Sequence, residues 1–174
     1  MSEASVVQTV RAMGYDVFVV PSEQAGLQGQ AFATEGCCHI NLFIDPRTPQ
    51  GAHVLWHEVG HHERGHTVYQ STYPQWVMEY EAERFALAKM KPCTDPETYA
   101  RIEDAVKAYL RPLLQGELDY GHDPQFNRAI AEWAGCDMTP RGELVEILHI
   151  RPPHLRAPVW RGVDFGDCED EIPF

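Results

Sequence analysis

The chain has 174 residues, of which 44% are hydrophobic and 23% charged, a composition typical of a single globular domain with its own core. Its formal net charge of −12 argues against direct binding to nucleic acid, which requires a basic surface. The sequence contains no apolar run of about 18 residues, so no membrane span is predicted. Residues 1–5 lack the features of a signal peptide. The five cysteines follow no repeating spacing, so no disulfide framework is predicted and a cytoplasmic location is expected.

The first 44 residues predict one helix followed by a small sheet. Val6, Val10 and Met13 recur at helical spacing, and Gly14 ends that helix. Strands are expected at 15–20, 31–34 and 38–44, because each segment is rich in β-branched, aromatic or apolar residues and is followed by a turn signal. Together they predict a small three-stranded sheet.

The rest of the chain is almost entirely helical in pattern. Helices are predicted over about 50–64 and 74–90, and from residue 95 to a bend or end at Pro112. Two more begin near 123 and 139, and Gly135 ends the first of these. The expected fold is α+β, with the sheet packed on a helical bundle. We expect one domain at 1–150, with a core at 1–92 and a helical extension at 93–150, followed by a proline-rich and then acidic tail at 151–174.

The motif with the clearest chemistry is His57-Glu58-Val59-Gly60-His61, which reads H-E-x-x-H. Residues four apart share one helix face, so His57 and His61 can bind the same divalent ion, with Zn²⁺ the default. Glu58 lies roughly 100° around the helix and can act as general base on a metal-bound water. The same pattern also occurs by chance on surface helices, so its context has to support the metal site.

A third ligand is expected from the next helix. Glu79 and Glu83 lie one turn apart on a face shared with Ala82 and Ala86, where small side chains let another helix approach closely. Glu79 is the candidate ligand. Glu83 is the candidate acceptor for the second ring N–H of a ligating histidine.

Two alternatives remain open for this segment. The acidic residues can instead form a solvated face, because glutamate is usually exposed. A third histidine ligand is the other alternative, but the pattern H-E-x-x-H-x-x-G-x-x-H requires glycine and histidine where the chain has Arg64 and Thr67. His66 is one place out of register and fits that pattern poorly.

With both helices considered, the chain resembles the ImmA/IrrE family of metallopeptidases, gluzincin-like proteins often found beside phage-type repressors. The matching segments are Ile40-Asn41, 54–61 (VLWHEVGH), 65–67 (GHT), 79–86 (EYEAERFA) and 90–92 (MKP). The family pattern is similar to E-x-E-A-[DN]-x-F-A followed by L-M-P, so Glu83 and Lys91 depart from it. The resemblance covers about residues 1–92.

The resemblance implies a minimal zincin-like domain with zinc bound by His57, His61 and Glu79. It implies that Glu58 acts as general base and acid in an endopeptidase. The implied substrate is a cytosolic protein such as a transcriptional repressor. The net charge and the lack of a long apolar run separately argue against a nucleic-acid or membrane partner. The oligomeric state is not defined by the sequence.

Two parts of the mechanism are less specific. An oxyanion needs a hydrogen-bond donor beside the metal, and the candidates are His66, Tyr69, Tyr73 and Tyr80, none of them favoured by spacing. An extended substrate is expected to lie along an exposed strand edge, for which Cys38 to Ile44 is the candidate.

Two other classes of function compete with a peptidase. A non-catalytic zinc module that binds or regulates a partner would use the same ligands, but it would have no need of Glu58. Residues 123–148 can also be interpreted as a helix-turn-helix, in which Arg141 is accompanied by Glu143 and Glu146. That acidic second helix is a poor surface for phosphate, so DNA binding is the weakest of the three interpretations.

Overall fold

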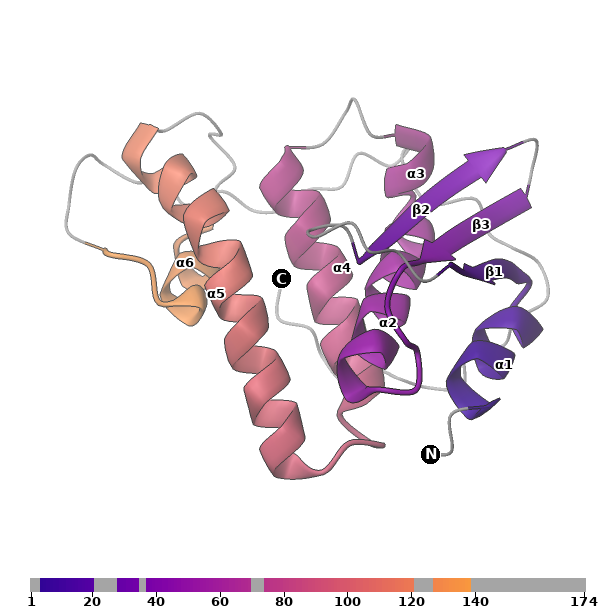
Figure 1. Cartoon of the computed structure of the whole chain (residues 1–174). Helices are drawn as coiled ribbons and strands as arrows, with labels where there is room; N and C mark the ends of the chain where they lie inside the picture. Colours follow the sequence, from indigo (N-terminus) through magenta and orange to yellow (C-terminus); the bar gives the residue numbers. More distant parts are fainter. Residues whose placement is uncertain (1–3, 21–27, 35–36, 70–73, 121–126, 139–174) are drawn as a thin grey trace.

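A computed structural model describes residues 4–20, 28–34, 37–69, 74–120 and 127–138. These residues form an α+β fold in which a small sheet lies on one side of the molecule and the long helices on the other (Figure 1). None of the described helices is long and apolar enough to cross a membrane. The predicted fifth helix, the second helix of the helix-turn-helix interpretation and the tail fall within 139–174, outside the described residues.

The sheet contains β1 (Tyr15–Val19), β2 (Gly29–Thr34) and β3 (Cys37–Leu42) in the order β1-β3-β2. β1 is parallel to β3, and β2 is antiparallel to it. The prediction that Cys38 to Ile44 forms an exposed edge is therefore wrong, because β3 is the central strand and pairs on both sides. Ile40 and Leu42 of β3 are fully buried, as expected of a central strand. The edge strand beside α2 is β2.

The helices are α1 (Ala4–Ala12), α2 (Pro49–Glu63), α3 (His66–Tyr69), α4 (Gln75–Met90), α5 (Pro96–Tyr120) and α6 (Arg128–Ala134). The motif helix α2 begins after Thr48, whose side-chain oxygen accepts a hydrogen bond from the Gly51 N–H at 3.0 Å. α5 does not end at Pro112, because Leu110 and Leu114 on either side of the proline are fully buried and hold the helix against its neighbours. The predicted end of α6 at Gly135 is confirmed.

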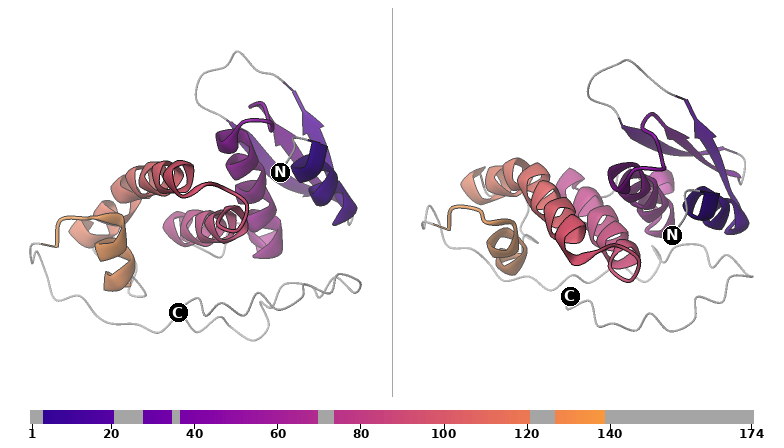
Figure 2. Two further views of the ribbon diagram at one scale, coloured as in Figure 1. Left: turned by 90° about the horizontal axis from the view of Figure 1, so that it is seen from below. Right: turned by 60° about the horizontal axis from the view of Figure 1, so that its bottom comes forward.

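Two hydrophobic cores meet along α4. The first lies between the sheet, α1 and α2, and takes Ala86 and Met90 from α4. The second lies between α4, α5 and α6, and takes Trp76, Val77 and Leu87 from α4. Both views in Figure 2 show α4 between α5 and the layer formed by α2 and the sheet. The position of α4 therefore depends on packing on both of its sides.

The contact between α2 and α4 is close because small residues face each other across it. A Cβ atom added at Gly60 would lie 2.9 Å from the Ala82 Cα and 3.0 Å from the Ala82 carbonyl oxygen. Both of those atoms belong to the backbone of α4 and cannot move independently of the helix. Any side chain at residue 60 must therefore push the two helices apart.

We predict that Gly60→Ala lowers the free energy of unfolding by about 1–2 kcal/mol, because the overpacking cost exceeds the gain in helix propensity. Gly116→Ala is the matched control, since a Cβ atom at Gly116 in α5 meets nothing within 4 Å. That control is expected to stabilise the protein by about 0.5–1 kcal/mol. Urea unfolding followed by circular dichroism measures both, and equal stabilisation by the two variants would contradict the close packing described for Gly60.

Candidate metal centre

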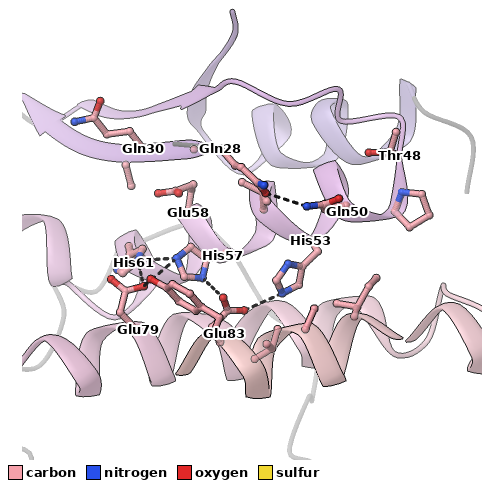
Figure 3. Close-up of a pocket in the computed structure, with 18 of the residues that line it drawn as sticks. Gln28, Gln30, Thr48, Gln50, His53, His57, Glu58, His61, Glu79 and Glu83 are labelled. Atoms are coloured by element: carbon pink, nitrogen blue, oxygen red, sulfur yellow. Dashed lines mark hydrogen bonds and ion pairs between the residues drawn. The ribbon is translucent and has the colours of Figure 1, made fainter. Parts of the chain in front are cut away.

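Three side chains from α2 and α4 converge on one point (Figure 3). His57 and His61 lie one turn apart on α2, with their Nε2 atoms 3.0 Å from each other. The Oε2 atom of Glu79, on α4, lies 3.5 Å from His57 Nε2 and 4.0 Å from His61 Nε2. Together these three residues could hold a metal ion. They are the three that the sequence predicted as ligands.

The separations suit a small divalent ion. Tetrahedral coordination with bonds of about 2.0–2.1 Å places ligand atoms roughly 3.3 Å apart. The three separations of 3.0, 3.5 and 4.0 Å lie around that value, so small side-chain adjustments would complete the site. Two imidazole nitrogens and one carboxylate oxygen are also the ligand types of catalytic zinc sites with an open position for water.

The second ring nitrogen of His57 faces the buried carboxylate of Glu83. His57 Nδ1 lies 3.2 Å from Glu83 Oε1, and the other carboxylate oxygen lies 2.8 Å from His53 Nε2. A proton on His57 Nδ1 leaves the lone pair of Nε2 directed at the metal position. Glu83 thus lies behind a candidate ligand histidine, as predicted, and its longer side chain still reaches the ring.

The second ring nitrogen of His61 faces another histidine. His61 Nδ1 lies 3.0 Å from His66 Nδ1, and His66 Nε2 lies 3.0 Å from Glu81 Oε2. If Glu81 accepts the His66 Nε2–H, then His66 Nδ1 can accept the proton of His61 Nδ1. His61 Nε2 is then unprotonated and can bind a metal. The sequence did not indicate Glu81, because a glutamate two residues from Glu79 is equally typical of a solvated helix face.

Of the four predicted oxyanion donors, the structure describes the side chains of His66 and Tyr80. Both ring nitrogens of His66 are engaged behind His61. Tyr80 packs against Trp133 in the second core, with ring centroids 5.9 Å apart, because its position on α4 faces α5 and α6. Tyr73 and the side chain of Tyr69 lie outside the described residues.

Glu58 faces the sheet and is not part of the ligand cluster. Its carboxylate accepts the backbone N–H of Ala31 in β2, and a Cβ atom at Gly29 would lie 2.6 Å from Glu58 Oε1. Burial raises the pKa of Glu58 to about 7, an effect that His57 opposes and the charge of Glu79 reinforces. A carboxylate with a pKa near neutrality can both accept and return a proton.

The two ligand histidines have opposite electrostatic environments. Burial alone would lower the pKa of His57, but the carboxylates of Glu83, Glu58 and Glu79 together outweigh it and the pKa rises to about 9. Burial, with the nearby His57, lowers the pKa of His61. Burial would raise the pKa of Glu83, but His53 and His57 lower it to about 2. In the absence of metal, His57 therefore carries a proton on both ring nitrogens, and its positive charge balances part of the buried negative charge.

A cleft of about 920 Å³ opens over the cluster. Gln28, Gly29, Gln30 and Ala31 from the β2 edge line one side of it. One face of α5 lines another side through Thr98, Arg101, Ala105 and Tyr109. The helical extension that follows the motif region therefore forms part of the same cleft.

Tyr109 is a site residue that the sequence did not reveal. Its hydroxyl donates a hydrogen bond of 2.9 Å to Glu79 Oε2, and its side chain is about half exposed, at 49%. Burial and the Glu79 charge raise the pKa of Tyr109, so the hydroxyl keeps its proton near neutral pH. Its position predicts only a residue at the border of the packed face of α5, because the next residue, Leu110, is fully buried.

Comparisons with protein-family models, curated proteins and solved structures find no match to this chain. The resemblance to the ImmA/IrrE family therefore stays a prediction that rests on the matching residues.

We predict that the purified protein binds one divalent metal ion per chain, and that His57→Ala and Glu79→Ala each abolish stoichiometric binding. Glu97→Ala is the matched control, because Glu97 is an exposed glutamate in the first turn of α5. Metal content after dialysis is measured by inductively coupled plasma mass spectrometry. A Glu79→Ala protein that kept a full equivalent of metal would remove Glu79 from the site.

Proposed function

We propose that this chain is a zinc-dependent endopeptidase acting on a cytosolic protein, with a transcriptional repressor as the candidate substrate class. The observation that carries the proposal is the position of Glu58. It is a buried carboxylate beside the cluster of His57, His61 and Glu79, and it is not a member of that cluster. A structural zinc site fills all four positions with protein ligands and needs no such base.

Zinc bound by the three ligands would polarise the scissile carbonyl and bring the pKa of a water toward ~7. Glu58 accepts a proton from that water while the water oxygen forms its bond to the carbonyl carbon. The carbon–nitrogen bond then breaks, and Glu58 returns the proton to the leaving nitrogen. The products are a carboxyl group and an amine, so water is the only co-reactant.

The edge of β2 is the best candidate for holding an extended substrate. The Phe43 N–H donates to the Gln28 carbonyl at 2.9 Å, so in this antiparallel pair Gln28 points its backbone groups toward β3. By alternation, Gly29, Ala31 and Ala33 point theirs toward the outer edge. Because the Ala31 N–H contacts Glu58, a peptide added along this edge would pass directly beside the general base.

The central prediction concerns Glu58→Gln. It should keep its metal and lose peptide cleavage by at least about 10²-fold, because the amide is nearly isosteric but cannot take a proton. Cleavage is measured by mass spectrometry on a proteome-derived peptide library loaded with the zinc form. Glu97→Gln, an exposed exchange of the same kind, serves as control. Equal cleavage by Glu58→Gln and wild type would falsify the peptidase mechanism and favour a non-catalytic zinc module.

A second prediction concerns Gly29, whose missing side chain makes room for Glu58. In Gly29→Ala the new Cβ atom would lie 2.6 Å from Glu58 Oε1 and 2.8 Å from Val54 Cγ1, so the carboxylate must move. A displacement of about 1 Å can cost about 10²-fold in rate, so kcat should fall by that order while metal content stays unchanged. Gly116→Ala is again the control, and an unchanged kcat in Gly29→Ala would contradict the position assigned to Glu58.

A further inference from the structure

We propose that Tyr109 is a catalytic residue whose hydroxyl donates a hydrogen bond to the scissile carbonyl oxygen as negative charge develops on it. This inference rests on the proposed peptidase function and adds a donor from α5. In this role the single O–H of Tyr109 turns from Glu79 Oε2 to the carbonyl oxygen, and no proton is transferred.

The first argument is the location of the hydroxyl at the ligand cluster. Tyr109 Oη lies 2.9 Å from Glu79 Oε2, and that same oxygen lies 3.5 Å from His57 Nε2. An ion held between these side chains would attract the oxygen of a substrate carbonyl to the same place. The Tyr109 hydroxyl is therefore within reach of the atom on which charge develops, as an oxyanion donor has to be.

The second argument is the arrangement of the cleft walls. Glu58 is held against β2 through the Ala31 N–H and the space at Gly29. Tyr109 approaches the cluster from α5, on the other side of Glu79, which belongs to α4. A base on one side and a neutral donor on the other are what addition of water to a carbonyl requires.

The third argument is exposure. A tyrosine that only filled the core would be buried, as the neighbouring Leu110 is, whereas 49% of Tyr109 is exposed and it lines the cleft. Tyr80 provides the contrast, because its ring packs against Trp133 in the second core. Both tyrosines lie close to Glu79, but Tyr109 points into the cleft and Tyr80 points into the second core.

The test compares zinc-loaded wild type with Tyr109→Phe, Tyr80→Phe and Glu58→Gln on the peptide that wild type cleaves best. We expect Tyr109→Phe to lower kcat by about 10²–10³-fold with KM changed by less than about threefold. Tyr80→Phe should behave as wild type. Zinc affinity, measured by competition with a chromophoric chelator, should be unchanged in Tyr80→Phe and lower in Tyr109→Phe, which loses the hydrogen bond to Glu79, so all variants are compared at saturating zinc.

Binding of a phosphonamidate analogue of the same peptide gives a readout that is independent of turnover. Its tetrahedral oxygens resemble the transition state, so its affinity for Tyr109→Phe should fall in parallel with kcat/KM, while affinity for the product peptides is unchanged. Wild-type kcat in Tyr109→Phe, or a loss of activity that excess zinc restores, would overturn the catalytic role of Tyr109 alone. Equal inactivity of wild type and Glu58→Gln would overturn the proposed function and this role together.

Discussion

The site depends on the close approach of α2 and α4 at Gly60 and Ala82. The histidines stand on one helix and the third ligand on the other, so the distance between the helix axes sets the distance between ligand atoms. A glutamate side chain is long enough to cross this contact only because neither residue at the crossing has a bulky side chain. The same contact joins the two cores, since α4 contributes residues to both. The packing and the geometry of the candidate metal site are therefore determined by the same pair of helices.

This geometry gathers negative charge in a partly buried place, and each carboxylate has a donor that offsets part of the cost. Glu83 has His53 and His57, Glu58 has the Ala31 N–H, and Glu79 has the Tyr109 hydroxyl. These contacts leave a net deficit of positive charge, which explains why the pKa of His57 rises to about 9 despite burial. A divalent cation would supply the missing charge and displace that proton.

The parts of the structure that the sequence predicted well are those set by local spacing. The motif helix, its partner helix and the positions of Glu79 and Glu83 follow from residues three or four apart on a helix face. The order of the strands in the sheet does not follow from local spacing. β3 is central because β1, more than 20 residues earlier in the chain, pairs with it in parallel, and no local pattern encodes that pairing. Tyr109 was missed for a similar reason, because only the packing of α5 on α4 brings it to Glu79.

The position of α5 shows that residues 1–92 and the helical extension after them form one cleft together. The resemblance ends near residue 92, which suggests a complete catalytic unit followed by an unrelated extension. The cleft does not divide in that way, because α5 lines it over about three turns from Thr98 to Tyr109. α5 is held there by the buried Val106, Leu110 and Leu114, which pack with α4 residues in the second core. The second core therefore positions one wall of the cleft, so a substitution that loosens it would disturb Glu79 and Tyr109 without touching the motif helix.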